Sequence, residues 1–281
     1  MRRAAFLAGT TAAACAARGA ARAASPAFAP FDDRTPIPVV RVRAGERELR
    51  FAIDTGDALS TITPAAADAL ALPRATAANA APQRVSLAGF ALAGATLRTH
   101  AALVVDGSAV AALTGFPVDG TLGYEAFRDR IVTLDYVKRR LTFPGVVPDG
   151  ERATIIWLKY DDRSPELITF DELKVDGFPA TAQLDTLMAK NAIVFTTKLA
   201  DLLIDNAPNA PRYDYEGTSL SPGRVGSIRL GTTTLASPAV VYQADASAHV
   251  PTTAIAVVVG DGLFAKRAVT LDLPSSTLTI S

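Results

Sequence analysis

The sequence contains very few of the side chains on which most metalloproteins and many hydrolases depend. Among its 281 residues there are one cysteine, Cys15, and two histidines, His100 and His249. Disulfide scaffolds, structural zinc and histidine-based metal sites each need several such residues, so these classes are excluded. A Ser-His-Asp triad would have to use one of the two histidines, and neither has a nucleophile-elbow pattern near it. We therefore expect surface or satisfied structural roles for both histidines, and neither a metal nor a cofactor.

The chain also lacks an excess of charge of one sign and lacks long apolar runs. Lys plus Arg and Asp plus Glu are equal at 28 each, and the longest basic cluster is the short Lys138-Arg139-Arg140. This balance argues against a nucleic-acid partner. Beyond residue 24 no stretch approaches about 18 uninterrupted apolar residues, so no membrane span is expected. With 49% hydrophobic and 20% charged residues, the composition is that of a globular protein with one large or two ordinary domains.

Residues 1–24 read as an export signal rather than as part of the fold. Arg2 and Arg3 are followed by a weakly apolar stretch, and the small residues of Ala21-Arg22-Ala23 fit a cleavage site. The paired arginines resemble a twin-arginine signal, which predicts a periplasmic or secreted protein. A lipoprotein anchored through Cys15 is the alternative, although the alanines before it lack the large aliphatic residue of a lipobox.

After a proline-rich spacer from Ser25 to Pro38, short apolar runs alternate with Asp-Gly and proline signals, a pattern typical of many short strands. Helical periodicity is confined mainly to Pro64 to Leu72 and Lys198 to Ile204. These features predict a mainly β, barrel-like fold with a few short helices. The predicted strands are Val39 to Arg43, Leu49 to Ile53, Arg84 to Leu87, Thr96 to Val105, Ile131 to Asp135 and Arg140 to Phe143.

An internal repeat is the most informative feature of the sequence. Asp185 follows Asp54 by 131 residues and Asp272 follows Asp135 by 137, so loops need absorb a difference of only 6 residues. The ordered recurrence indicates a duplicated lobe. The paired segments are Arg50 to Gly56 with Thr181 to Leu187, Thr121 to Phe127 with Val258 to Phe264, and Ile131 to Asp135 with Ala268 to Asp272.

Two carboxylates delivered by equivalent loops onto a pseudo-twofold axis can share one proton and hold a water between them. One then acts as base toward the water while the other polarises a substrate carbonyl, which permits amide hydrolysis without a metal or a covalent intermediate. The hydroxyls of Thr55 and Thr186 can bond the facing loop's backbone. Gly56 permits close backbone approach.

These loops resemble those of the pepsin-like and retropepsin-like aspartic protease superfamily. Its marks are an apolar-apolar-Asp-Thr-Gly loop and a later apolar-apolar-Gly segment that crosses beneath it. The matching residues are Ala52 to Gly56 with Thr121-Leu122-Gly123, and Gln183 to Leu187 with Val258-Val259-Gly260.

The resemblance implies two pseudo-twofold-related acid-protease (retropepsin-like) β-barrel lobes in one chain, at residues 36–146 and 152–281. It further implies an aspartic endopeptidase with catalytic Asp54 and Asp185, supported by Thr55, Gly56 and Thr186. The partner would be a peptide or protein substrate bound between the lobes of a monomer.

Leu187 departs from the family pattern because it stands where the second glycine is expected. The alternative is therefore a catalytically inactive, two-lobed peptide-binding pseudoprotease. Tyr213 and Tyr215 are candidates for a flap that covers the substrate, or for anchors of a long surface loop. A carbohydrate-active enzyme with paired carboxylates would leave the repeat and the glycine segments unexplained.

Overall fold

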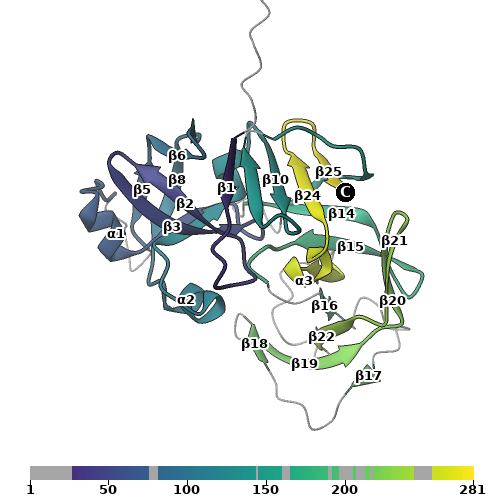
Figure 1. Ribbon diagram of the computed structural model, residues 1–281. Coiled ribbons are helices and arrows are strands. Elements are labelled where there is room, and N and C mark those ends of the chain that lie inside the picture. Colours follow the sequence, from purple (N-terminus) through teal and green to yellow (C-terminus); the bar gives the residue numbers. More distant parts are fainter. Residues whose placement is uncertain are drawn as a thin grey trace, which may run out of the picture.

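The computed structural model describes residues 27–75, 82–143, 145–159, 165–188, 192–195, 205–206, 213–215, 218–243 and 255–281. The proposed signal and the predicted helix from Lys198 to Ile204 lie outside these residues. The described chain is mainly β with few helices, so the prediction of a mainly β fold is confirmed. Within the described residues, none of the helices is both long and apolar enough to cross a membrane. Figure 1 shows the three sheets that the strands form.

The sheet of the first half has the strand order β5-β8-β4-β9-β3-β2-β6-β7. Its alternating or fully apolar strands bury one or both faces, as expected for half-barrel sheets. Their bounds are β2 (Val39–Ala44), β3 (Arg47–Asp54), β4 (Ser60–Ile62), β5 (Arg84–Leu87), β6 (Phe90–Leu92), β7 (Ala95–Thr96), β8 (His100–Val104) and β9 (Gly120–Gly123).

The sheet of the second half has the order β17-β19-β22-β16-β23-β15-β14-β20-β21, with β13 paired to β14 and β18 paired to β19. Asp176 and Gly177, both with positive φ, form the turn between β14 and β15. The bounds are β13 (Ile156–Lys159), β14 (Glu166–Val175), β15 (Phe178–Leu184), β16 (Ala192–Phe195), β17 (Asp205–Asn206), β18 (Tyr213–Tyr215), β19 (Thr218–Arg224), β20 (Ser227–Leu230), β21 (Thr233–Ala236), β22 (Ala239–Gln243) and β23 (Val257–Val259).

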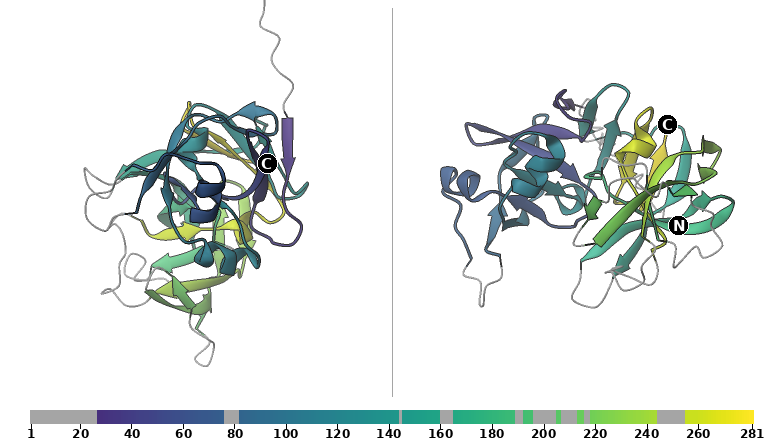
Figure 2. Two further views of the ribbon diagram at one scale, coloured as in Figure 1. Left: turned by 90° about the vertical axis from the view of Figure 1, so that its left-hand side faces the viewer. Right: turned by 90° about the horizontal axis from the view of Figure 1, so that it is seen from below.

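The two sheets repeat one another strand by strand. The order β5-β8-β4-β9-β3-β2-β6-β7 corresponds to β19-β22-β16-β23-β15-β14-β20-β21, and the second sheet has β17 as an additional strand beside β19. In each sheet the strand that leads to an Asp-Thr pair runs parallel to a later strand, β3 beside β9 and β15 beside β23. The sequence repeat is therefore reproduced in strand order and direction. Seen from below in Figure 2, the strands of the two halves lie on opposite sides of the molecule.

A third sheet joins the two halves in the order β1-β11-β10-β24-β25-β12. At its centre β10 pairs antiparallel with β24, with Thr133 opposite Thr270 and a distance of 2.9 Å between their Oγ1 atoms. Because this pairing is symmetric about Thr133 and Thr270, the local twofold axis passes between them. The bounds are β1 (Ala27–Pro30), β10 (Ile131–Asp135), β11 (Arg140–Phe143), β12 (Glu151–Thr154), β24 (Ala268–Asp272) and β25 (Thr277–Ile280).

Some local predictions need correction. The segment assigned to a spacer contains β1, which pairs antiparallel with β11 and forms an edge of the third sheet. The strand predicted from Thr96 to Val105 is broken, because β7 pairs with β6 whereas β8 pairs with β5. The helix predicted from Pro64 to Leu72 ends at Ala69, since Ala71 adopts a positive φ of 49°.

The short helices are α1 (Pro64–Ala69), α2 (Ser108–Thr114), α3 (Asp261–Phe264) and the single 3₁₀ turn η1 (Tyr124–Phe127). Thr63 caps α1 through its side chain, which accepts a hydrogen bond from the amide of Ala66. Helix α2 was not predicted, and α3 takes up the Asp261-Gly262 dipeptide that the sequence assigned to a turn. Figure 1 places α3 next to the central strands, between the two halves.

Candidate active site

Asp54 and Asp185 lie at corresponding ends of the two parallel strand pairs. Asp54 is the last residue of β3, where its Cα is paired with that of Gly123 on β9. Asp185 directly follows β15, and its amide donates to the carbonyl of Val259 on β23 at 2.9 Å. Each carboxylate is thus positioned by a central strand that is held on its flank by a parallel neighbour.

The threonines that follow the two aspartates bond to one another across the halves. The amide of Thr55 donates to Oγ1 of Thr186 at 3.1 Å, and the amide of Thr186 donates to Oγ1 of Thr55 at 3.2 Å. Each hydroxyl in turn donates to a carbonyl of the opposite strand, Thr55 to Leu184 at 3.1 Å and Thr186 to Ile53 at 2.7 Å. Both side chains are buried, so these four bonds fix the loops against each other in a site without competing solvent.

Each aspartate also accepts hydrogen bonds from its own loop. Oδ1 of Asp54 accepts from the amides of Gly56 at 3.1 Å and Asp57 at 3.2 Å. Oδ1 of Asp185 accepts from the amide of Leu187 at 2.9 Å. Such turns hold a carboxylate in one orientation and favour its charged form.

Gly56 lies directly against the second carboxylate. A Cβ atom at this position would be 2.8 Å from Cγ of Asp185, closer than such atoms approach in proteins. The carbonyl of Gly56 accepts a further bond from the side chain of Gln183 at 3.1 Å. The glycine is therefore required by space rather than by backbone conformation, and the two loops are in contact at this point.

Burial and neighbouring charge raise the pKa of Asp54 well above its ordinary value. Burial is the largest cause, the charge of Asp185 is the second and that of Asp57 the third, while the amides of Asp57 and Gly56 oppose the shift. Asp185 is itself only 6% exposed. Two carboxyl groups in this environment do not both ionise readily, so the pair retains a proton at a pH where an exposed aspartate has lost it.

Leu187 does not separate the loops. Its side chain is partly buried and packs against a cluster in the first half made of Ile37, Val39, Ala52 and Val118, joined by Val110 and Phe116. Met188, the next residue, is buried in a different cluster with Leu167, Val241, Ile255 and Val258. The threonine bonds form with leucine present, because the side chain finds apolar contacts in the opposite half.

Sequence reasoning missed the burial of Asp261. This residue is 4% exposed, its Oδ1 accepts a hydrogen bond from the hydroxyl of Tyr136, and its Oδ2 has no hydrogen-bond partner among the described residues. Burial and then the charge of Asp185 raise the pKa of Asp261 well above the ordinary range, while burial and Asp261 do the same for Tyr136. The repeat contained the signal, since Asp261 occupies the place that Tyr124 has in the first half.

The proposed flap residues, Tyr213 and Tyr215, lie on a strand of the second sheet. The backbones of Tyr213 and Tyr215 form β18, which pairs with β19, and their side chains lie outside the described part of the structure. His100 is 8% exposed and bonded to Ser60 and to the carbonyl of Arg98, which agrees with a satisfied structural role. His249 lies outside the described residues.

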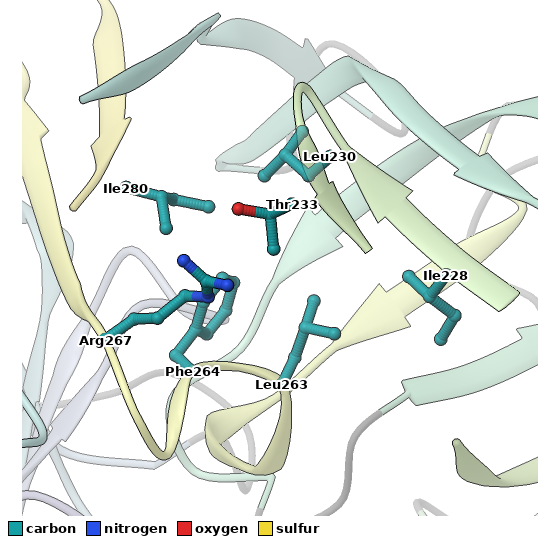
Figure 3. A pocket seen from close by; sticks show the side chains of 7 residues that line it. All are labelled: Ile228, Leu230, Thr233, Leu263, Phe264, Arg267 and Ile280. Carbon is teal, nitrogen blue, oxygen red and sulfur yellow. The ribbon is translucent and has the colours of Figure 1, made fainter. Parts of the chain in front are cut away.

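Among the described residues, no group of three or more His, Cys, Asp or Glu side chains is arranged to hold a metal ion. Two hollows lie elsewhere. The one in Figure 3 has a volume of about 10 Å³ and is lined mainly by apolar side chains of β20, α3 and β25, with Arg267 at its edge. The other, of about 390 Å³, is lined by the segment from Pro30 to Arg34, by β2 and by Arg50 of β3.

Comparison of the chain with protein-family models and with curated proteins finds no match.

Proposed function

We propose that this chain is an aspartic endopeptidase of the pepsin-like and retropepsin-like type. One observation carries the proposal: the half-buried Asp54 and the buried Asp185, each followed by threonine, come from equivalent strand ends and are joined by reciprocal threonine bonds. Holding two like charges close together in a shielded site costs free energy. Folding alone would therefore not favour an aspartate in both loops.

The raised pKa of Asp54 supports a pair that shares one proton, so that one carboxylate is the base and the other carries the proton. The ionised carboxylate takes a proton from water as the water oxygen bonds to the peptide carbonyl carbon, and the protonated carboxyl group donates its proton to the carbonyl oxygen. When the carbon-nitrogen bond breaks, a proton passes to the amine nitrogen and the products are a carboxylic acid and an amine. Thr55, Thr186 and Gly56 hold the two loops in place throughout.

The wider proposal follows the sequence resemblance. The two lobes are residues 36–146 and 152–281, and an extended peptide binds across the groove between them with Tyr213 and Tyr215 in the flap. The chain acts as a monomer outside the cytoplasm after export by its N-terminal signal.

A second function remains open because of Leu187. Its side chain reaches the apolar cluster of the first half and lies at a place where aspartic proteases have no side chain. A leucine there would narrow the space beside Asp54 and leave a protein that holds a peptide without cutting it.

Cleavage of a peptide library across acidic to neutral pH tests both functions. We expect cleavage by wild type and at least a hundredfold lower kcat/KM for Asp54→Asn and for Asp185→Asn, because each residue carries one of the two proton transfers. Binding without cleavage by wild type would favour the inactive alternative. Equal cleavage by Asp185→Asn and wild type would contradict the shared mechanism.

A further inference from the structure

His100 and Ser60 form a buried pair behind the first aspartate loop. Ser60, on β4, is fully buried, and its Oγ lies 2.7 Å from Nε2 of His100, the first residue of β8. Nδ1 of the same imidazole lies 2.7 Å from the carbonyl oxygen of Arg98. The aspartate mechanism uses neither side chain.

The partners fix the hydrogen-bond directions. A carbonyl oxygen only accepts, so Nδ1 of His100 carries a proton and donates to Arg98. In the neutral ring Nε2 is then an acceptor, and the hydroxyl of Ser60 donates to it. The lone pairs of Ser60 Oγ are left to accept the amide of Gly123 at 3.1 Å. When the imidazole is neutral, the polar groups that link Arg98, His100, Ser60 and Gly123 all have hydrogen-bond partners.

Gly123 connects this pair to the candidate site. Its Cα is paired with that of Asp54 in the parallel ladder between β3 and β9. A Cβ on Gly123 would lie 2.5 Å from the carbonyl oxygen of Ala58, so the backbone after the first aspartate loop packs directly on it. The next amide, that of Tyr124, donates to the carbonyl of Asp57 at 3.0 Å. A displacement of Gly123 therefore moves the loop that holds Asp54.

Protonation of His100 disrupts this arrangement. Nε2 would become a donor toward Ser60 Oγ, which already accepts from Gly123, and the serine hydroxyl would have to find a new acceptor in a fully buried position. Burial is the largest cause of a lowered pKa for His100, and the positive charge of the Arg98 side chain lowers it further. The hydrogen bond to the backbone carbonyl of Arg98 and the negative charge of Glu125 both act to raise this pKa. Arg98 and Glu125 also form an ion pair at 3.0 Å, which balances the nearby charges.

We propose that His100 is a positioning residue that, through Ser60, holds Gly123 beside Asp54 only while the imidazole is neutral. Protonation of His100 then sets the acid limit of peptide cleavage. This inference rests on the proposed function for its effect on catalysis, whereas the link from His100 to Gly123 stands without it.

The link itself is tested by nuclear magnetic resonance on the purified chain with Asp54→Asn, which prevents self-cleavage. The chain has two histidines, so isotope-labelled histidine gives two signals, and His249→Gln assigns them. We expect the amide signal of Gly123 to shift with the same midpoint as the His100 ring, and to lose that transition in Ser60→Ala. An amide signal that does not follow the ring, or that follows it equally in Ser60→Ala, would overturn the proposal.

The catalytic consequence is tested with His100→Gln, which keeps an oxygen acceptor near Ser60 and does not titrate. At about one pH unit below the His100 midpoint we expect wild type to lose about tenfold in kcat/KM, and His100→Gln to lose less than about twofold. His249→Gln is the control and should behave as wild type. Identical acid limbs for wild type and His100→Gln would refute the effect on catalysis. If wild type cuts nothing at any pH, the proposed function fails while the resonance experiment still decides the link.

Discussion

Thr55 and Thr186 each donate their backbone amide to the other's side-chain hydroxyl, so the two halves of the chain exchange hydrogen bonds at one point beside the carboxylates. The exchange is symmetric although the residues stand 131 positions apart in the sequence. Its consequence is that neither aspartate loop can shift without breaking bonds in the other.

Replacing Thr186 by valine should weaken both stability and catalysis. Valine has a similar shape but leaves the amide of Thr55 and the carbonyl of Ile53 without their partner. A buried group left unsatisfied costs about 1–3 kcal/mol, so the free energy of unfolding in urea should fall by that amount. Thr186→Ser keeps the hydroxyl and is the control. Equal stability of the valine and serine variants would contradict a role for the hydroxyl.

Gly56→Ala should lower cleavage about a hundredfold, with a smaller effect on folding. The added methyl would lie 2.8 Å from Cγ of Asp185 and would force the carboxylates apart. A displacement of about 1 Å in a catalytic group can cost roughly a hundredfold in rate, which kcat/KM would measure. Gly94→Ala is the control. Its positive φ of 81° makes the substitution costly for folding, but the added methyl meets open space and touches no other residue. It should therefore lower stability without lowering kcat/KM. An active Gly56→Ala variant would be inconsistent with close contact of the loops.

Leu187→Ala should destabilise the chain while leaving cleavage within about tenfold of wild type. Its partly buried side chain gives up contacts with the first-half cluster, and such truncations cost about 1–2 kcal/mol when burial is incomplete. Thermal unfolding and kcat/KM would separate the two effects. If wild type cleaves nothing but Leu187→Gly does, the leucine side chain prevents cleavage. That result would favour the peptide-binding alternative for wild type.

Asp54→Asn should raise stability at neutral pH. The folded state raises the pKa of Asp54 above its ordinary value of 3.8, so the folded chain binds this proton more tightly than the unfolded chain does. Stability from this group is fully present below 3.8 and falls as the pH rises through the folded pKa. Asparagine removes that loss, so its unfolding temperature should exceed that of wild type at neutral pH and approach it in acid.

The control for that experiment is Asp33→Asn, since the side chain of Asp33 is 93% exposed. This variant should follow wild type at every pH. If Asp54→Asn gains no stability at neutral pH, the ionised Asp54 is not strained in the folded chain, and the proposed sharing of a proton loses its support.

The sequence by itself determined the pairing of the two halves. Asp54 and Asp185 could be matched because strand alternation and the Asp-Thr pair leave local marks that survive in both copies, and β5, β10 and β11 begin and end where the pattern predicted. Regular strands are local in origin, because side chains alternate between faces with a period of two.

Only the tertiary structure decided the surroundings of the side chains near those carboxylates. In the sequence, Asp261 belongs to one of the Asp-Gly pairs that signal turns, Leu187 departs from the family pattern, and His100 is expected to have a surface or satisfied structural role. Their surroundings come from distant segments: Tyr136 for Asp261, the first-half cluster for Leu187, and Ser60 for His100. Burial and partner choice depend on contacts between residues far apart in the chain, and a local pattern carries no information about those contacts.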